Sequence, residues 1–387
     1  MENKAIKKIL LIADTFFPEK NSAALMLHTL AKYIYSEKIE LIVVTPHENH
    51  KNKIIFLNEK YTHLKFYCPY LKSNNLALRT YGEFLLSKFF IRSTKLYKNY
   101  FKDISLIISY SPTIFFGPYI KYLKKEFNIK KSYLILRDIF PQWIIDLNIL
   151  NKNNPIYFLF KYYEKILYRN SSRIGVQSEN NKKYFETSIY KSNVEYLPNW
   201  YQNDIVIEKY NLFNKINYKY KIIYTGKLSF AQSLKNFQFF IDLIINIPET
   251  CFIYVGDNFK QIKTNENVFS FNSVSQEQLQ YLLSESDLGI VNLDKRHTTH
   301  NVPGKSLNYL AKGLPIIASL NTNNDFIDII NFNKIGYATS KELFEHEDII
   351  SEIEKIFKNY NEYSMNAKNF IKQYHSVKGA FDKIRKI

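Results

Sequence analysis

NVPGKSLNYLAKGLPIIAS, residues 301–319, predicts a turn, a short helix and a buried strand in direct succession. Apolar side chains recur at helical spacing over residues 305–312. Gly313 then ends the helix, because glycine readily takes the left-handed conformation found after a helix C-terminus. Pro315 prevents the helix from resuming just before the apolar run 316–318. Such a succession is typical of an α/β protein with a parallel sheet.

The start of this helix is suited to an anion. Gly304 and Lys305 open it, and the first amides of a helix have no partner inside the helix. The helix dipole adds partial positive charge at the same place. An ordinary scaffold helix is the alternative, and on the local pattern alone it is the commoner outcome. Features elsewhere in the chain are needed to distinguish an anion site from a scaffold helix.

Composition indicates a globular protein of two domains. The chain has 387 residues, of which 46% are hydrophobic, which is enough for two cores of ordinary size. Its two cysteines, Cys68 and Cys251, are far apart in strand-like contexts, so a reducing compartment without a disulfide framework is expected. No apolar run reaches the length of a membrane span. We expect a cytoplasmic protein, either soluble or peripheral on the inner face of the cytoplasmic membrane.

Positive charge is concentrated in the first half of the chain. The net charge is +17, and residues 1–200 hold 31 Lys and Arg against 16 Asp and Glu. The other 187 residues hold 22 against 20. A basic first half predicts an anionic partner, either nucleic acid or an acidic membrane surface. A lysine-rich composition that merely keeps the protein soluble is the alternative.

Strand and helix patterns alternate along the chain in two series. Strands of the first series are expected at 7–16, 39–45, 104–109, 132–137, 173–177 and 194–197. Those of the second are expected at 220–225, 252–255, 268–271 and 288–291, followed by the opening stretch and a helical tail. We therefore predict domains at 1–200 and 201–370, with a C-terminal helix at 371–387 that packs back on the first domain. No G-x-G-x-x-G follows the first strand, so a dinucleotide site is not supported there.

Residues 83–102, EFLLSKFFIRSTKLYKNYFK, predict a basic and aromatic amphipathic helix. The cationic residues recur at steps of three and four and share one face: Lys88, Arg92, Lys95, Lys98 and Lys102. Such a helix can lie in the interface of an anionic membrane. A helix with solvated lysines is the alternative. Nucleic acid is disfavoured, because the basic residues accompany apolar aromatics on helices and match no helix-turn-helix or RNA-binding sheet motif.

Several kinds of chemistry have little support. His297 and His300 form a histidine pair at ligand spacing, but beyond Asp294 their loop supplies no further ligand. No metal is expected. The G-x-S-x-G elbow of α/β hydrolases and the Walker loop of P-loop NTPases are both absent from the sequence.

Loops at the carboxyl ends of strands are what remains, because ligands of doubly wound sheets gather there. Three such loops of the second domain contain a glycine next to a charged residue: Gly226-Lys227, Gly256-Asp257 and Gly304-Lys305. Glycine allows close backbone approach, and lysine supplies a point charge for a diphosphate. The corresponding loops of the first domain are 14–22, 110–113 and 137–138. This layout suits a nucleotide-activated donor in the second domain and an acceptor in the first.

With these loops in view, the sequence resembles the retaining family-4 glycosyltransferases of the GT-B fold. The closer likeness is to bacterial O-antigen and capsule enzymes of the N-acetyl-L-fucosamine transferase type. The likeness covers nearly the whole chain and is carried by DTFFPEKNSAALMLHTLA, RDIFPQW, IGVQSE, VEYLPNW, YTGKLSFAQSLKNF and VPGKSLNYLAKGLPIIAS. It implies two Rossmann-like doubly wound domains facing a cleft, with a helical C-terminal tail.

The resemblance also implies roles for single residues. Lys227 takes the place of the basic residue that touches the donor diphosphate. The family's second basic residue falls on Gln232, so Lys305 is the candidate replacement. Its two glutamates, eight residues apart, fall on His300 and Asn308. Asn308 can hydrogen-bond ribose hydroxyls through its amide, whereas His300 does not simply inherit the role of a carboxylate.

The first domain departs from the family pattern as well. The glycines usual in the family's first loop are replaced around Asn21 and Ser22. Asp138, within RDIFP, takes the position of a polar group near the transferred sugar. The predicted catalytic residues are Asp138 and His300. The predicted donor-binding residues are Gly226, Lys227, Gln232, Gly256, Asp257, Pro303, Gly304, Lys305, Ser306 and Asn308. The predicted acceptor-side residues are Asn21, Ser22, Ser111 and Arg137.

The resulting prediction is a retaining, metal-independent glycosyltransferase without a cofactor. It would move a sugar from a nucleotide-sugar, expected to be UDP-linked and to carry an N-acetylated amino sugar, to a lipid-linked saccharide of O-antigen or capsule biosynthesis. The membrane would be contacted through Lys88, Arg92, Lys95 and Lys98. The alternatives are a GDP-sugar-dependent transferase, a sugar-nucleotide epimerase of the same fold and, more remotely, a nucleic-acid-binding protein.

Overall fold

The computed structural model describes residues 6–19, 21–71, 73, 75–201, 207–210, 216–226, 234–257, 266–296, 302–341 and 349–387. The chain divides into two compact units. Unit 1 consists of Met1–Pro198 and Val377–Ile387, and unit 2 of Asn199–Ser376.

Unit 1 is built on an eight-stranded sheet in the order β3-β4-β2-β1-β5-β6-β7-β8. Its neighbours pair in parallel, except that β3 and β4 form an antiparallel hairpin. The strands are β1 (Lys8–Ile12), β2 (Glu40–His47), β3 (Lys53–Asn58), β4 (Tyr61–Tyr67), β5 (Leu106–Ser111), β6 (Lys131–Leu136), β7 (Arg173–Val176) and β8 (Val194–Tyr196). Every residue of β5 is buried, because helices cover both faces of the sheet, as is usual for parallel strands.

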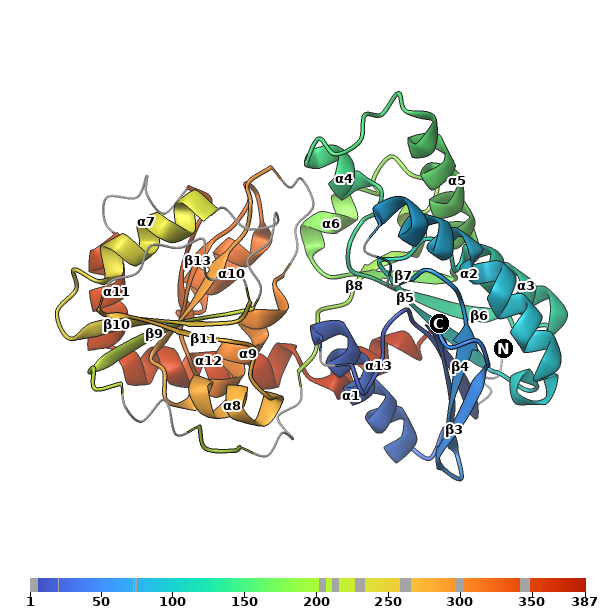
Figure 1. The fold of residues 1–387 in the computed structure, drawn as a ribbon, viewed down its shortest axis with the longest axis horizontal. Coiled ribbons are helices and arrows are strands. Elements are labelled where there is room, and N and C mark those ends of the chain that lie inside the picture. Colours follow the sequence, from blue (N-terminus) through green and yellow to red (C-terminus); the bar gives the residue numbers. More distant parts are fainter. Residues whose placement is uncertain are drawn as a thin grey trace. The chain divides into compact units, whose positions relative to one another are not determined.

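The helices of unit 1 lie on the two sides of its sheet. Figure 1 shows α2, α3 and α5 on one side and α1 with α13 on the other. The helices are α1 (Ser22–Ser36), α2 (Leu76–Leu96), α3 (Gly117–Glu126), α4 (Gln142–Asp146), α5 (Pro155–Arg169), α6 (Glu179–Lys183) and α13 (Val377–Ile384), with short 3-10 turns η1 (Lys98–Phe101) and η2 (Lys191–Asn193). Ser178 caps α6 by accepting a hydrogen bond from the Asn181 amide at 3.1 Å.

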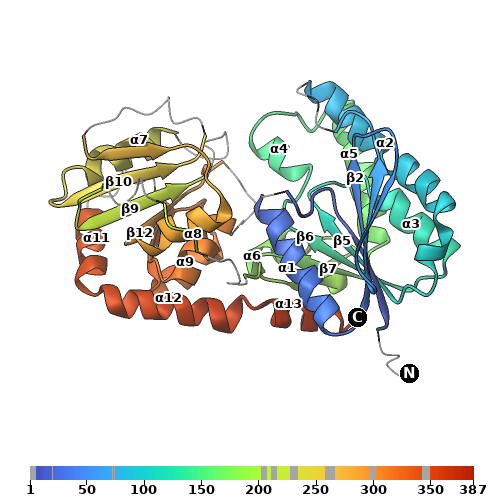
Figure 2. The same ribbon diagram turned by 60° about the horizontal axis from the view of Figure 1, so that its bottom comes forward.

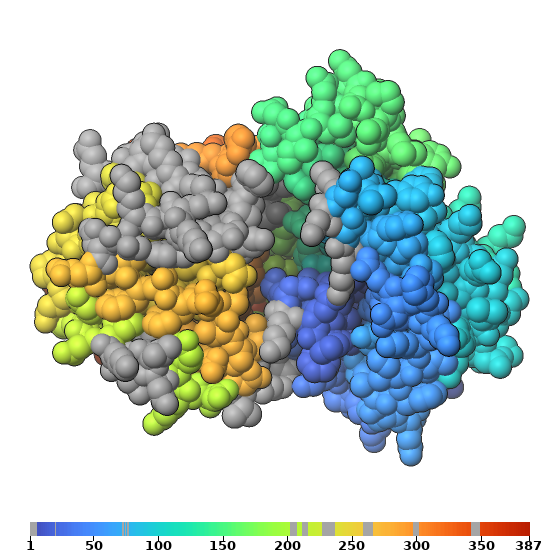
Figure 3. Space-filling model, viewed as in Figure 1, coloured from blue at the N-terminus to red at the C-terminus, as the bar shows by residue number. Residues whose placement is uncertain are grey.

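The single basic helix predicted over residues 83–102 is wrong at both ends. Helix α2 begins seven residues earlier, where the Asn75 side chain accepts hydrogen bonds from the first amides. It ends at Leu96, and η1 follows. Phe101, in the 3-10 turn, is fully buried. The apolar spacing in the sequence therefore continues past the end of α2, so it does not reveal where the helix ends. Figure 3 shows α2 and the β3–β4 hairpin on one face of unit 1.

Unit 2 contains a six-stranded, wholly parallel sheet in the order β11-β10-β9-β12-β13-β14. Its strands are β9 (Tyr220–Thr225), β10 (Thr250–Val255), β11 (Val268–Phe271), β12 (Leu288–Asn292), β13 (Ile316–Ser319) and β14 (Gly336–Thr339). Its helices are α7 (Leu234–Ile244), α8 (Gln276–Ser284), α9 (Gly304–Lys312), α10 (Asp325–Phe332), α11 (Ile349–Lys358) and α12 (Tyr360–Tyr374).

Alternate residues of each strand in unit 2 serve two separate cores. Ile222 and Phe252 belong to the core under α7 and α11, whereas Ile223 and Ile253 belong to the core under α8, α9, α10 and α12. This follows from the two-residue period of a strand, which points successive side chains to opposite faces. Figure 2 shows α9 and α12 together on one face of this sheet.

The deciding stretch folds as its pattern predicts. Helix α9 ends at Gly313, whose φ of +79° lies in the left-handed region. Strand β13 follows and is buried throughout. In the C-terminal tail, α12 ends at Tyr374 and α13 packs in unit 1, where the rings of Tyr33 and Phe381 lie 5.9 Å apart. Within the ranges given above, no helix combines the length and apolar content that crossing a membrane requires.

Candidate active site

The carboxyl edge of the sheet in unit 2 brings two glycines together. Gly226 follows β9 with a φ of +108°, and Gly256 follows β10 with a φ of +153°. A Cβ added to Gly256 would lie 2.4 Å from the Gly226 carbonyl oxygen, so only glycine fits this position. The Tyr254 hydroxyl lies within hydrogen-bonding distance of the carbonyl oxygens of both Gly226 and Asp257. Among the residues that the structure describes, this edge thus presents backbone at Gly226 and Gly256.

Lys305 faces this surface from the first turn of α9. Its Nζ lies 3.6 Å from the ring centroid of Tyr224, and a Cβ on Gly226 would lie 3.6 Å from the same nitrogen. Among the described residues, no carboxylate forms an ion pair with it. Desolvation lowers the pKa of Lys305 to about 7. A half-buried ammonium beside helix amides, in contact with a ring rather than with an anion, is suited to binding a phosphate.

The helix that carries Lys305 is held firmly to β9. The Tyr309 hydroxyl accepts a hydrogen bond from the Thr225 amide at 2.8 Å. Its ring lies on Gly289, where a Cβ would come within 2.3 Å of the ring. The first turn of α9 is therefore fixed against the strand that leads into Gly226.

The other donor-side residues predicted from the sequence fall into three groups. Pro303 and Gly304 start α9, Asn308 is half-buried on it, and the Ser306 hydroxyl is buried without a hydrogen-bond partner. Asp257 is exposed and accepts a hydrogen bond from the Ser273 hydroxyl at 3.0 Å. The third group lies outside the described residues: Lys227, Gln232 and His300.

At the carboxyl edge of the sheet in unit 1, the notable polar group is the carboxylate of Asp14. Asp14 follows β1, and its Oδ1 is buried without a hydrogen-bond partner. Burial, supported by the nearby carboxylates of Glu83 and Glu19, raises the pKa of Asp14 to about 6. Ser111, at the end of the adjacent strand β5, is also buried with an unpartnered hydroxyl. Two buried polar groups without partners at a strand edge indicate a place for a polar ligand.

Asp138 and Arg137 follow β6 at the same edge but differ in environment. Asp138 is half-buried; burial of the neighbouring Tyr110 hydroxyl raises the pKa of that hydroxyl, and the charge of Asp138 adds to this effect. The Arg137 guanidinium is turned into the unit, where it donates hydrogen bonds to the carbonyl oxygens of Leu197 at 2.8 Å and Pro198 at 3.4 Å. Arg137 thus fixes the end of the chain segment that leaves unit 1, and burial lowers its pKa to about 10.

Asn21 serves as the cap of α1. Its side-chain oxygen accepts a hydrogen bond from the Ala24 amide at 2.8 Å, and its Nδ2 donates to the Thr15 hydroxyl at 2.8 Å. Ser22 is exposed at the start of the same helix. The loop after β1 is therefore ordered by Asn21, which positions the chain beside Asp14.

Two functional candidates escaped the sequence analysis as individual residues. Asp14 was only the first residue of a predicted loop, although a carboxyl group directly after a central buried strand is itself a signal. Tyr224 lies inside a strand, and its contact with Lys305 joins positions 81 residues apart, which no local pattern reveals. In the part of the chain that the structure describes, no three His, Cys, Asp or Glu side chains gather as metal ligands would.

Comparison with solved structures identifies the fold. A structure from E. coli described as trehalose-6-phosphate bound with UDP-2-fluoro glucose matches with a TM-score of 0.70 at 11% identity, over 98% of this chain and 99% of that one. HepE of Anabaena with UDP and glucose matches at 0.64 and 13%, over 98% of both chains. WaaG, a glycosyltransferase involved in lipopolysaccharide biosynthesis, matches at 0.62 and 12%, over 98% and 100%. The chain has the GT-B fold.

A family match adds to this GT-B assignment. Residues 228–383 match the family described as glucosyltransferase 3-like, C-terminal domain. This match covers most of unit 2 and reaches into α13. Among curated proteins, none matches the sequence.

Proposed function

We propose that this GT-B protein is a glycosyltransferase that takes its sugar from a nucleotide-sugar bound to unit 2. The observation that carries the proposal is Lys305, a half-buried ammonium without a described counter-ion, facing Gly226 at the start of α9. A donor diphosphate supplies the missing negative charge, and Asn308 one turn along the helix is placed for a ribose hydroxyl. Lys227 would add a second cation, as the family resemblance implies.

Transfer with retention needs little besides charge stabilisation. The bond between the anomeric carbon and the diphosphate breaks, and the acceptor oxygen bonds to that carbon on the same face. Lys305 and the first amides of α9 stabilise the negative charge that develops on the leaving diphosphate. The acceptor proton passes to the leaving phosphate. This needs no metal, and Asp14 and Asp138 of unit 1 are the candidates to hold the acceptor.

We further propose which donor and which acceptor the enzyme uses. The donor is a UDP-linked sugar, in the first place an N-acetylated amino sugar, and the acceptor is a lipid-linked saccharide of O-antigen or capsule biosynthesis. It is supported by the sequence resemblance and by the basic surface of α2, which suits a protein that works peripherally on the inner face of the cytoplasmic membrane. Nucleic acid is not a partner in this proposal.

A thermal-shift screen with UDP, GDP and their sugars tests the donor site. A bound nucleotide raises the melting temperature by mass action, and preference for UDP over GDP identifies the donor class. Lys305→Ala should abolish the shift and lower kcat/KM at least tenfold, whereas Lys312→Ala, at the other end of α9, should leave both unchanged. An unchanged kcat/KM in Lys305→Ala would remove this residue from the site. A product without linkage to an acceptor would favour the epimerase alternative.

A further inference from the structure

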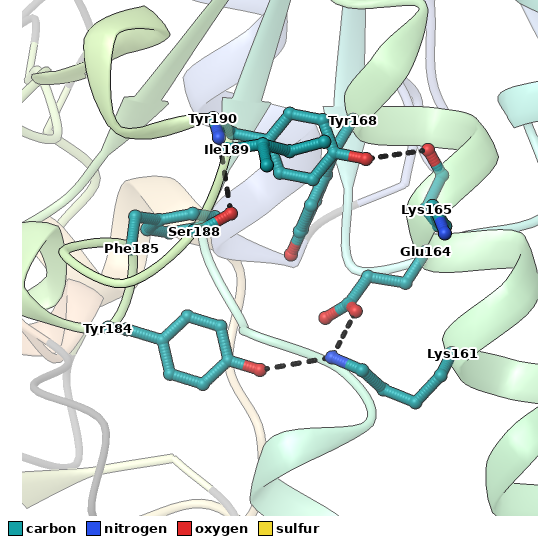
Figure 4. Close-up of a pocket in the computed structure, with 9 residues that line it drawn as sticks. All are labelled: Lys161, Glu164, Lys165, Tyr168, Tyr184, Phe185, Ser188, Ile189 and Tyr190. Carbon is teal, nitrogen blue, oxygen red and sulfur yellow. Dashed lines mark hydrogen bonds and ion pairs between the residues drawn. The ribbon is translucent and has the colours of Figure 1, made fainter.

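A second pocket lies wholly within unit 1, away from the strand ends that form the candidate active site. Its volume is about 410 Å³, and it opens between α5 and the segment that joins α6 to η2. Figure 4 shows Lys161, Glu164 and Tyr168 entering it from the helix and Tyr184, Phe185 and Tyr190 from the segment.

Glu164 is an uncommon residue for the buried face of a helix. Its side chain is 5% exposed, and one carboxylate oxygen forms an ion pair with the Lys161 ammonium. That ammonium also donates a hydrogen bond to the Tyr184 hydroxyl at 3.4 Å. The other oxygen, Oε1, is buried and has no hydrogen-bond partner. A buried carboxylate oxygen left without a partner is costly, so a ligand that donates to it would be favoured.

Tyr168 supplies the complementary group one helical turn further on. It is 3% exposed, and its hydroxyl is buried without a hydrogen-bond partner. The hydroxyl lies close enough to the Glu164 carboxylate for the two to interact, but outside ordinary hydrogen-bond geometry. Figure 4 shows it directed into the pocket above that carboxylate. The pocket therefore offers one acceptor and one donor at adjacent points.

The Glu164 acceptor and the Tyr168 donor together limit which functional group of a ligand can bind here. An ammonium ion could donate to the Glu164 carboxylate, but it would leave the Tyr168 hydroxyl hydrogen without an acceptor, and the neighbouring Lys161 and Lys165 repel it. A phosphate can accept from Tyr168 but meets the Glu164 carboxylate. A hydroxyl group both donates and accepts, so it satisfies both residues.

The walls indicate a compact ligand with apolar faces. The Tyr168 ring packs 5.5 Å from that of Phe185 and 5.7 Å from that of Tyr190. Aromatic walls around a few polar groups are usual for pockets that bind organic ligands. A single water occupies about 30 Å³, far less than this volume. We infer that this pocket of unit 1 binds a sugar or another cyclic polyol, with Glu164 and Tyr168 holding one of its hydroxyl groups.

Saturation-transfer NMR on the full chain tests the inference. The probes are methyl glucoside, methyl galactoside, N-acetylglucosamine and myo-inositol, with ethylamine and inorganic phosphate as probes of the other two chemistries. At least one hydroxylated probe should show transfer. Tyr168→Phe and Glu164→Gln should each weaken its affinity about tenfold or more, because each removes one hydrogen bond or its charge. Tyr163→Phe is the matched control, since Tyr163 lies on the same helix but does not line the pocket.

Stability provides the second readout. Tyr168→Phe removes a hydroxyl that has no partner, so the melting temperature should stay the same or rise. The UDP-induced shift of unit 2 should be unchanged in this variant, which separates the pocket from the proposed donor site. Transfer that survives both pocket substitutions, stronger transfer from ethylamine or phosphate, or no transfer at all would overturn the inference. A melting temperature lowered by several degrees in Tyr168→Phe would show a structural hydroxyl and would overturn it as well.

Discussion

At the scale of single residues, the two candidate edges hold groups that cost stability. Lys305 is half-buried without a described counter-ion, and Asp14 is enclosed without a hydrogen-bond donor for Oδ1. Both have pKa values moved toward neutrality by desolvation. Folding alone gives no reason for either group, because an apolar side chain of similar size would be more stable at these positions. Groups kept at such a cost are typical of ligand-binding sites.

Asp14→Asn should therefore stabilise the protein while lowering its transferase activity. The native pKa of Asp14 is raised from 3.8 to about 6, and each pKa unit corresponds to about 1.4 kcal/mol. A raised acid pKa destabilises the native state above that pKa, and the penalty disappears as pH falls below the unfolded value. The variant should be more stable by about 1 to 3 kcal/mol at pH 7, since partial exposure reduces the full effect.

Urea unfolding at pH 7 and at pH 4 measures this difference. It should be largest at pH 7 and much smaller at pH 4, where native Asp14 is protonated and the unfolded carboxyl group is close to its own pKa of 3.8. A variant that is less stable than the wild type at pH 7 would show that the Asp14 carboxylate is held by an interaction that outweighs its burial.

At the scale of elements, α2 presents a basic surface whose extent differs from the sequence prediction. Lys88, Arg92 and Lys95 are exposed on this helix. Lys98 lies beyond its end in η1 and forms an ion pair of 2.7 Å with Glu126. Exposed apolar side chains on the neighbouring α5 extend the same unit's apolar surface: Ile156, Phe158, Leu159 and Tyr162. The two helices touch where the rings of Phe84 and Tyr163 lie 5.5 Å apart.

Replacing Lys88, Arg92 and Lys95 together by Gln should weaken binding to anionic liposomes. Each cation near such a surface contributes about 1 kcal/mol, so the partition coefficient should fall on the order of 100-fold at low salt. The loss should shrink as salt is added, because screening already weakens the wild type. Lys98→Gln is the matched control, since Glu126 already neutralises that charge, and it should bind almost as the wild type does. Equal effects of Lys98→Gln and the triple variant would contradict the role of α2.

The elements also show what a single sequence can and cannot predict. Most strands of both sheets and the succession of turn, helix and strand at 301–319 follow from periodicity and from Gly313, because these signals are local. The hairpin of β3 and β4 and the edge strand β14 were not predicted. The end of α2 was missed, since η1 continues the apolar spacing beyond Leu96. The pocket at Glu164 was missed too, although a carboxylate four residues from Phe160 on a buried helix face is a visible anomaly. Its partners on the following segment come together only through tertiary packing.

At the scale of the whole molecule, each unit has its own hydrophobic core, and the chain crosses from one unit to the other at 198–199 and at 376–377. Helix α13 returns to unit 1, where Arg385 and Lys383 lie near Glu37 and the Tyr196 carbonyl oxygen. Each unit is thus stabilised mainly by its own contacts, and each can open by its own local equilibrium.

Hydrogen exchange on the intact chain, with and without UDP, tests both this independence and the donor site. A ligand at 100 times its Kd stabilises the unit that binds it by about 2.7 kcal/mol, because only the folded form binds. Exchange should therefore slow through β9, β10 and α9, while the amides of β5 and α5 keep their rates. Methyl glucoside, if it occupies the pocket of unit 1, should slow α5 instead. Equal slowing of both units by UDP would show that they open together, and no slowing in unit 2 would contradict a nucleotide site at Lys305.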